Sequence, residues 1–175
     1  MLLNWQPLNT GRLFLLNIGQ PCWKRSIKAV TEMKRAGKVL ILFVIGAGLY
    51  FEIELNWRFF ANTLPVHWSM PILGGVLFVL LGGINNWLPW EMPLQMQAVL
   101  GAAACTAAEF TAGCILNIWL GLDVWDYSDK PFNLLGQICP QFSLAWLGLS
   151  IVAIVLDDLL RYWLFKEEKP HYTLV

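Results

Sequence analysis

The sequence predicts an all-α, polytopic membrane protein: a four-helix transmembrane bundle with a short interfacial or re-entrant segment before the last span. Apolar residues make up 57% of the chain and charged residues only 14%, with ten tryptophans, a balance beyond that of ordinary soluble domains. Long stretches, including 59–90 and 131–156, carry no Asp, Glu, Lys or Arg. The apolar runs are continuous rather than alternating, which disfavours a transmembrane barrel.

The four spans are expected near residues 39–60, 69–88, 94–118 and 139–163. Each is long enough as a helix to cross about 30 Å of hydrocarbon. They divide the chain into a basic N-terminal arm at 1–38, a transmembrane domain at 39–165 and a tail at 166–175. Residues 1–31 mix short apolar patches with Asn, Gln, Pro and Gly. They form either an amphipathic surface arm or an artefact, if translation begins at Met33.

Positive residues indicate how the chain lies in the membrane, because Lys and Arg stay preferentially on the cytoplasmic side. They gather before the first span and around the end of the fourth, at Lys24, Arg25, Lys28, Lys34, Arg35, Lys38, Arg161, Lys166 and Lys169. We therefore expect a multi-pass protein of the cell (inner) membrane with both termini in the cytoplasm. The connection between the third and fourth spans would then face outside.

Several tryptophans fall close to the predicted span ends, where an apolar ring with one polar atom suits the membrane interface. We interpret these residues as anchors rather than as chemical groups: Trp68, Trp87, Trp90, Trp119, Trp125, Trp146 and Trp163.

Glu109 is the most informative ionisable residue, because it stands alone in the middle of the third span. A carboxyl group at that depth is costly unless it faces protein or a cavity. Gly101, Cys105, Gly113 and Asn117 share its four-residue period, a ridge of small or polar residues that another helix can approach closely. Glu109 either holds helices together by hydrogen bonds or forms an ion, proton or substrate site.

Glu52 shows the same pattern on the first span, where Gly48, Glu52 and Asn56 are four residues apart. It also has a structural and a functional interpretation. Glu54 and Arg58 have the spacing of an intrahelical ion pair, which we place at a solvated helix end. The functional hypothesis joins Glu52 and Glu109 in one polar centre.

The segment VWDYSDKPFNLLGQICPQFSLAW, from Val124 to Trp146, combines polar and turn-forming residues between two spans. Asp126 and Ser128 can turn the chain by bonding nearby amides, and Pro131 prevents a helix from continuing. Asn133 can cap a short interfacial or re-entrant helix. Gly136, Gln137 and Pro140 then interrupt the start of the fourth span, so backbone carbonyls there need protein partners or a water-filled cavity. The segment is either part of a binding site or a compact cap without a ligand.

The sequence has no Walker loop, dinucleotide fingerprint, nucleophile elbow or zinc-ligand spacing, so we expect no enzyme and no cofactor. An intramembrane enzyme is disfavoured because His67 and His171 are isolated near span ends. The cysteines are expected to be free thiols, since Cys105 and Cys114 lie inside a span. No nucleic-acid partner is expected.

The segment from Val124 to Trp146 resembles a family of small bacterial membrane proteins described as putative ABC-transporter type IV, or CmpB-like permeases. The likeness rests on WDYS, PFN, GQIC, FS and a Trp, which here are Trp125–Ser128, Pro131–Asn133, Gly136–Cys139, Phe142–Ser143 and Trp146. It extends over about Leu40–Phe165.

Looser similarities lie on the spans. The family's acidic-aromatic-T-x-G pattern is similar to Glu109, Phe110, Thr111 and Gly113, and its late first-span Glu is similar to Glu52. The family often has a second acidic residue at the end of the third span, where this chain has Asn117.

The resemblance implies a permease component of a membrane transporter. It implies a separate ATPase subunit as a partner, while the apolar spans imply the lipid bilayer and the transport hypothesis includes further copies of the chain. Combined with the buried carboxyls, this gives a transport hypothesis in which these residues bind a substrate or ion: Glu52, Glu109, Asn117, Trp125, Asp126, Tyr127, Ser128, Asn133 and Gln137. The alternative is a structural or regulatory membrane protein whose polar residues serve helix packing and partner binding.

Overall fold

The computed structural model describes residues 22–86, 88–89 and 91–173, with side chains from residue 34 onward except that of Asn86. The chain divides into two units, Met1–Lys38 and Val39–Val175. Residues 1–21 of the expected N-terminal arm, together with Trp87 and Trp90, lie outside the described residues. In the first unit, the structure describes the beginning of a helix that starts at Cys22.

The described chain is helical, which confirms the expected all-α class. Its elements are α2 (Cys22–Ala61), α3 (Ser69–Gly82), the short η1 (Ile84–Asn86), α4 (Leu94–Gly113), its π-helical continuation η2 (Cys114–Trp119) and α5 (Pro140–Phe165). No strand occurs in this part of the chain, where Leu134 and Ile138 form an isolated bridge.

Three helical segments among the described residues are long and apolar enough to cross a membrane: Lys34–Ala61, Leu94–Trp119 and Pro140–Phe165. Little of their apolar surface is buried within the chain, between 11% and 28% of each window. Large side chains such as Leu40, Phe60 and Leu144 point outward. Such a surface suits a lipid environment, where apolar groups need no protein cover.

The second predicted span, 69–88, contains a shorter helix than expected. α3 has 14 residues and ends at Gly82, so it extends only about 21 Å at the helical rise. Gly82 and Gly83 lower the helix propensity at this point, and the chain continues into the 3-10 turn of η1. The helical part alone is therefore shorter than a full span.

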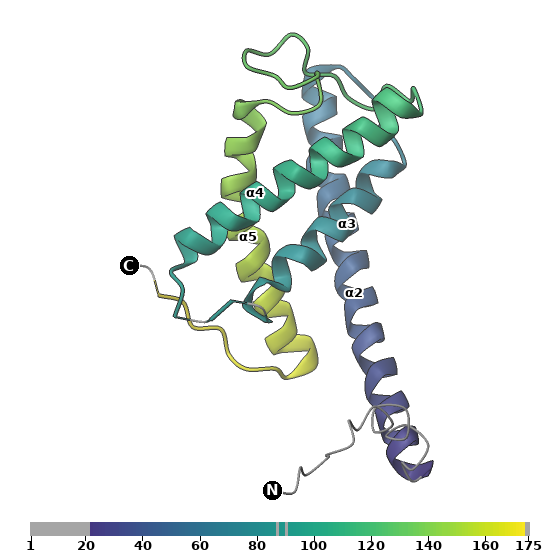
Figure 1. The fold of residues 1–175 in the computed structure, drawn as a ribbon, viewed down its shortest axis with the longest axis vertical. Coiled ribbons are helices and arrows are strands. Elements are labelled where there is room, and N and C mark those ends of the chain that lie inside the picture. The colour runs from purple at the N-terminus through teal and green to yellow at the C-terminus, as the bar shows by residue number, and fades with distance from the viewer. Residues whose placement is uncertain (1–21, 87, 90, 174–175) are drawn as a thin grey trace, which may run out of the picture. The chain divides into compact units, whose positions relative to one another are not determined.

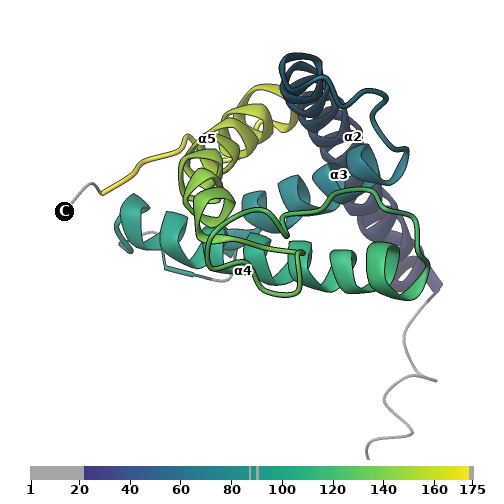
Figure 2. The ribbon, with the colours of Figure 1, turned by 90° about the horizontal axis from the view of Figure 1, so that it is seen from above.

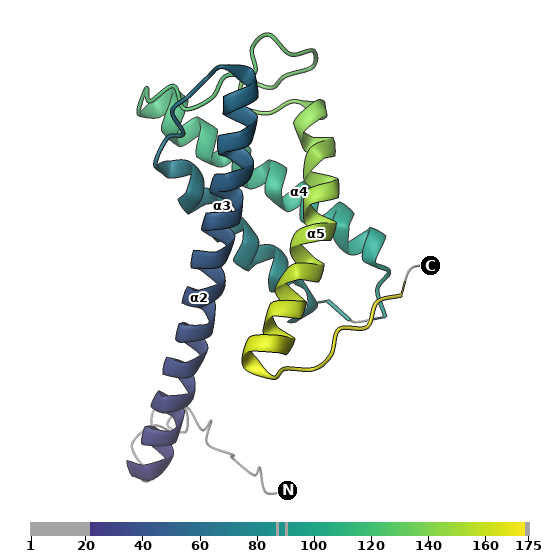
Figure 3. The ribbon, with the colours of Figure 1, turned by 180° about the vertical axis from the view of Figure 1, so that it is seen from behind.

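In the second unit, α4 crosses in front of both α3 and α5 (Figure 1), and both contacts are direct. From above, the chain after α4 passes back over the bundle to reach the start of α5 (Figure 2). From behind, α2 and α5 run side by side (Figure 3), with Tyr50 of α2 stacked 6.0 Å from Trp146 of α5.

The ridge of small residues expected on the third span lies at the contact of α4 with α5. Cys105 is 1% exposed. A Cβ atom on Gly101 would lie 3.1 Å from the Ser150 hydroxyl of α5 and 2.7 Å from Leu81 of α3. Close helix packing thus explains this part of the pattern.

Glycines on α3 also serve close contacts. A Cβ atom on Gly75 would lie 2.7 Å from the ring of Phe43, and one on Gly74 would overlap Tyr50. These contacts seat α2 against α3, which agrees with a packing role for the glycines of the second segment.

Candidate functional site

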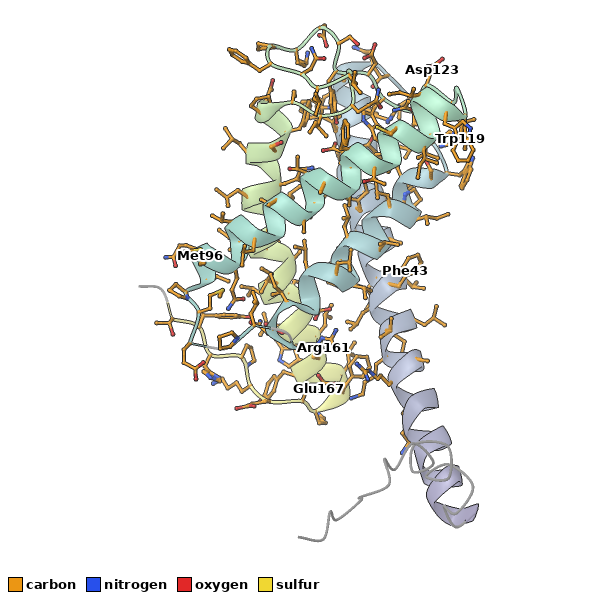
Figure 4. All side chains as sticks on the ribbon, viewed as in Figure 1. Phe43, Met96, Trp119, Asp123, Arg161 and Glu167 are labelled. Carbon is orange, nitrogen blue, oxygen red and sulfur yellow. The ribbon has the colours of Figure 1, made fainter. Side chains whose placement is uncertain are left out.

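Residues 121–139 form a loop of turns at the end of the bundle, called the cap below. Figure 4 shows Trp119 and Asp123 at this end, and Arg161 and Glu167 at the opposite end of α5. The cap contains no helix, so the helix expected here is not formed. Pro131 is followed by left-handed backbone at Phe132, Leu135 and Gly136, a conformation that interrupts a right-handed helix.

Asn133 caps a turn rather than the expected helix. Its side-chain amide donates to the Lys130 carbonyl at 2.8 Å and the Ser128 carbonyl at 3.2 Å. Its side-chain oxygen accepts the Gly136 amide at 3.0 Å. Asn133 therefore closes the loop on itself and does not line the cavity described below.

Asp126 and Ser128 make the turn that the sequence indicates. The Asp126 carboxylate accepts the backbone amide of Ser128 at 2.8 Å and its hydroxyl at 2.6 Å. Gly136 lies against this turn, and a Cβ atom there would be 2.6 Å from the Ser128 hydroxyl oxygen. Together with its φ of +69°, this contact explains why glycine occupies the position.

Asn117, at the end of η2, ties the cap to the bundle. Its oxygen accepts the Val124 amide at 2.7 Å. Its nitrogen donates to the Trp125 carbonyl at 2.9 Å and to the Gln137 side-chain oxygen at 2.7 Å. An amide supplies both the donor and the acceptor that this junction needs, so Asn117 has a clear structural role without an acidic group.

The carbonyls expected to need partners before α5 find them within the protein. The Gln137 carbonyl accepts the Trp125 indole N–H at 3.0 Å, and the Gly136 carbonyl accepts the Tyr127 amide at 2.8 Å. Pro140 then opens α5 in its first turn, where the missing N–H is tolerated. The interruption of the fourth span is thus a satisfied helix start.

Glu109 lies on α4 beneath the cap and is 6% exposed. Its two carboxylate oxygens accept hydrogen bonds from different parts of the protein. Tyr127 of the cap donates its hydroxyl at 3.0 Å, and Trp146 of α5 donates its indole N–H at 2.8 Å. Glu109 therefore connects α4, the cap and α5.

Both donors to Glu109 are neutral groups. Burial, and next the adjacent Glu109 carboxylate, raise the pKa of Tyr127 above that of an ordinary phenol. Tyr127 therefore keeps its proton and can donate it to Glu109 in a hydrogen bond. Within the described part of the chain, no lysine or arginine forms an ion pair with Glu109.

A cavity of about 650 Å³ lies between α2, α4, the cap and α5, and Glu109 is part of its wall. Its volume falls in the usual range for small-molecule sites. Aromatic residues form much of the lining: Tyr50, Trp57, Trp125, Tyr127, Phe142 and Trp146. Tyr127 stacks on Phe142 at 4.5 Å between ring centres, and Trp57 meets Phe142 edge to face at 5.6 Å.

The first helix contributes Glu54, not Glu52, to this cavity. Glu52 is exposed on another face of α2, so the expected pairing of Glu52 with Glu109 is not what the structure contains. The two-residue step between Glu52 and Glu54 turns their side chains about 200° apart around a helix. The four-residue pattern with Gly48 and Asn56 identified a face of α2, but that face is exposed.

The ion pair between Glu54 and Arg58 is present at 2.7 Å, but it is largely buried rather than solvated. Arg58 also donates to the Val124 carbonyl of the cap at 2.7 Å. Weaker bonds reach the carbonyls of Thr63 and Pro65 at 3.3 and 3.5 Å. Arg58 thus holds the start of the cap against the end of α2.

The structure therefore brings together six of the nine predicted site residues and separates the other three. Those lining the cavity are Glu109, Trp125, Asp126 and Tyr127, with Asn117 and Gln137 holding the cap from behind, whereas Glu52, Ser128 and Asn133 lie outside it. Trp146 differs from its interpretation as an interface anchor, being 7% exposed and bonded to Glu109. Trp68, Trp119 and Trp163 are exposed, as anchors should be.

Sequence reasoning missed the contribution of α2 to the cavity. Glu54 lies four residues after Tyr50, and Trp57 and Arg58 lie three and four residues after Glu54, the spacing of one helix face. This stripe of polar and aromatic residues was a usable signal. Glu52 was preferred because it is evenly spaced with Gly48 and Asn56 at four residues.

A second cluster of buried carboxylates lies at the other end of α5. Asp158, 6% exposed, accepts the Asn85 amide and the Tyr172 hydroxyl, each at 2.6 Å. Asp157, fully buried, forms an ion pair with Arg161 one turn later. Neither aspartate was singled out from the sequence, because both fall near the predicted end of the fourth span.

The fold and the cavity define a class of protein: a helical membrane protein with a polar, aromatic-lined cavity beneath a structured cap. Residues 41–171 match the family described as "Putative ABC-transporter type IV". The chain belongs to this family, as its WDYS and GQIC motifs indicated. Searches of curated proteins and of solved structures find no match.

Family membership and the three apolar helices identify the chain as a membrane component of a transporter family. The family is a transporter class and not an enzyme class. An ABC-type family implies a lipid environment and an ATPase partner.

Proposed function

We propose that the chain is the solute-binding membrane component of a transporter, and that the cavity beneath the cap holds the solute. One observation carries the proposal. The bond from Tyr127 to Glu109 joins the most specific family motif to a buried carboxylate, and both residues line the same cavity. Glu109 is the group that recognises the solute.

The cap and its ties support a role in admitting the solute. The cap is fixed at its base by Asn117 and Arg58, while Tyr127 reaches over Glu109. A solute that engages Glu109 competes with this tyrosine. Binding is thereby linked to the position of the cap, which is the kind of coupling that a transporter needs.

The positive-residue pattern supports an orientation in the inner membrane with both termini in the cytoplasm and the cap outside. In this orientation the opposite end of the bundle, with Asp157 and Asp158, faces the ATPase partner. Association of several copies of the chain would complete the bundle in the bilayer.

The proposal is tested by measuring thermal stabilisation of the purified chain by panels of amines, sugars, amino acids and organic acids, since a bound ligand stabilises the folded state. One class should stabilise the unmodified protein and lose most of that effect with Glu109→Gln. Glu52→Gln is the matched control, because it makes the same change at an exposed site outside the cavity. A response that Glu109→Gln leaves unchanged contradicts the proposal.

A structural role is the second candidate, since Glu109 connects three elements. It makes a different prediction about Glu109→Gln. If the carboxylate only holds helices together, no solute class distinguishes the two proteins, and any effect of the substitution is confined to stability or to the assembly. Unfolding curves recorded beside the ligand panel separate the two roles.

A further inference from the structure

We infer that the cavity beneath the cap takes an organic cation, such as a small alkylammonium compound, held between the Glu109 carboxylate and the aromatic walls. This inference rests on the proposed function, because it names the class of solute for the same cavity. It follows from the charges around the cavity, its aromatic lining and its size.

The charges around the cavity are predominantly negative. Five acidic residues line it, Glu54, Glu109, Asp123, Asp126 and Asp129, against two basic ones, Arg58 and Lys130. Each basic group already has an acidic partner, Arg58 with Glu54 and Lys130 with Asp129, both at 2.7 Å. The remaining three acidic residues leave the cavity short of positive charge.

The states of the charged groups in the cap agree with this balance. The hydrogen bonds from Ser128 lower the pKa of Asp126, so its carboxylate stays ionised near neutral pH. The hydrogen bond to Asp129 raises the pKa of Lys130, so the lysine stays protonated beside that carboxylate. Neither group supplies a free positive charge for an anionic solute.

Glu109 is the acidic group that most needs a positive partner. It is buried, and its two hydrogen-bond donors are neutral. A buried charge without a counter-charge carries a large desolvation cost. A cationic solute in the cavity would remove that imbalance, whereas an anionic one would increase it.

The aromatic walls favour an organic cation over a bare metal ion. Aromatic faces attract ammonium groups, especially where water is excluded. Six of the residues that line the cavity are aromatic. Among the described residues, no group of three His, Cys, Asp or Glu is placed to hold a metal.

The test uses two thiol reagents of opposite charge, a trimethylammonium and a sulfonate methanethiosulfonate, in the full chain in lipid nanodiscs. Ala145→Cys places a thiol on the cavity wall. Leu135→Cys, 64% exposed and outside the cavity lining, corrects for intrinsic reactivity. The unmodified chain measures the background from the native cysteines.

The cationic reagent should be favoured at Ala145→Cys by about tenfold relative to Leu135→Cys, as a nearby uncompensated charge implies. Adding Glu109→Gln should reduce this preference, and adding Glu52→Gln should not. An equal or greater rate for the sulfonate overturns the cation inference and leaves a solute cavity in place. No reaction with either reagent contradicts the proposed function itself, because the cavity is then closed to water-borne solutes.

A tetramethylammonium ion should protect the thiol at Ala145→Cys more strongly than its uncharged isostere, neopentane. Protection should weaken by about tenfold with Glu109→Gln. Equal protection by the two compounds would show that shape, not charge, selects the occupant and would overturn the inference.

Discussion

Buried carboxylates lie near both ends of α5, and they differ in what surrounds them. At one end, Asp157 is paired with Arg161, and Asp158 is bonded by Asn85 and Tyr172. At the other end, the described residues that bond Glu109 are the neutral donors Tyr127 and Trp146, and the carboxyl group faces a cavity. The comparison separates Asp157, whose charge has a partner within the protein, from Glu109, whose carboxyl has neutral donors and faces a cavity.

The surroundings of the two clusters follow the same division. Around Asp158, two hydrogen bonds hold the tail against the bundle. The Tyr172 hydroxyl donates to Asp158, and the Leu94 amide donates to the Thr173 carbonyl. Burial, and next the bond to Asp158, raise the pKa of Tyr172, which keeps this donor protonated. Here the polar groups fix a chain end, whereas beneath the cap they surround open volume.

Removing the charge partner of Asp157 should have the largest effect on stability. Arg161→Ala leaves the carboxylate of Asp157 buried without its ion pair, which should lower the free energy of unfolding by about 3–5 kcal/mol. Denaturant unfolding of the chain in detergent measures this loss. Lys169→Ala, at an exposed position in the tail, is the control, and an equal effect of both changes would remove the distinction between the two ends.

Loosening the cap should have a smaller and local effect. Asn117→Ala removes three hydrogen bonds to Val124, Trp125 and Gln137. Unpaired groups at this junction should cost about 1–3 kcal/mol. Hydrogen exchange should rise in residues 121–139 and stay unchanged in α5 beyond Ser150. An equal increase in exchange over the whole chain would instead show that Asn117 stabilises the entire fold.

The smallest effects should come from single hydroxyl groups, one at each end. Tyr127→Phe and Tyr172→Phe each remove one bond to a buried carboxylate and should cost about 0.5–1.5 kcal/mol. Their functional consequences should differ, since only Tyr127 lines the cavity. Solute affinity measured by ligand-induced stabilisation should change with Tyr127→Phe alone. A matching change with Tyr172→Phe would couple the tail to the solute site.

Composition and charge-free stretches were sufficient to predict the helical membrane class and the approximate helices, because lipid exposure demands long apolar runs. The sequence also located Glu109 and the motif that covers it. It did not predict the end of α3 at Gly82, since an apolar run does not reveal where a helix stops. Nor did it predict a cap without a helix, because the left-handed backbone at Phe132 and Leu135 has no clear sequence signature.

The sequence did not predict that Glu54, rather than Glu52, lines the cavity. Both lie near the end of the first span and each shares a face with residues at helical spacing, so contacts with other elements decide between the two faces. Glu54 is turned inward with Arg58, which reaches the Val124 carbonyl across 66 residues of sequence. Trp146 has the position of an interface anchor in the sequence, but in the structure its indole N–H donates to Glu109 of α4. Long-range partners of this kind are not encoded in local spacing.

The central claim, that the Glu109 charge is held for a solute, is tested most directly by matched amide substitutions without any solute. A glutamine at position 109 can keep both bonds, since the Tyr127 hydroxyl can also accept one. Glu109→Gln should therefore leave the unfolding free energy unchanged or raise it, since it also removes an unpaired buried charge, whereas Asp157→Asn should lower it by about 3 kcal/mol or more. Equal destabilisation by the two substitutions would contradict the account and place Glu109 among the residues that hold the bundle together.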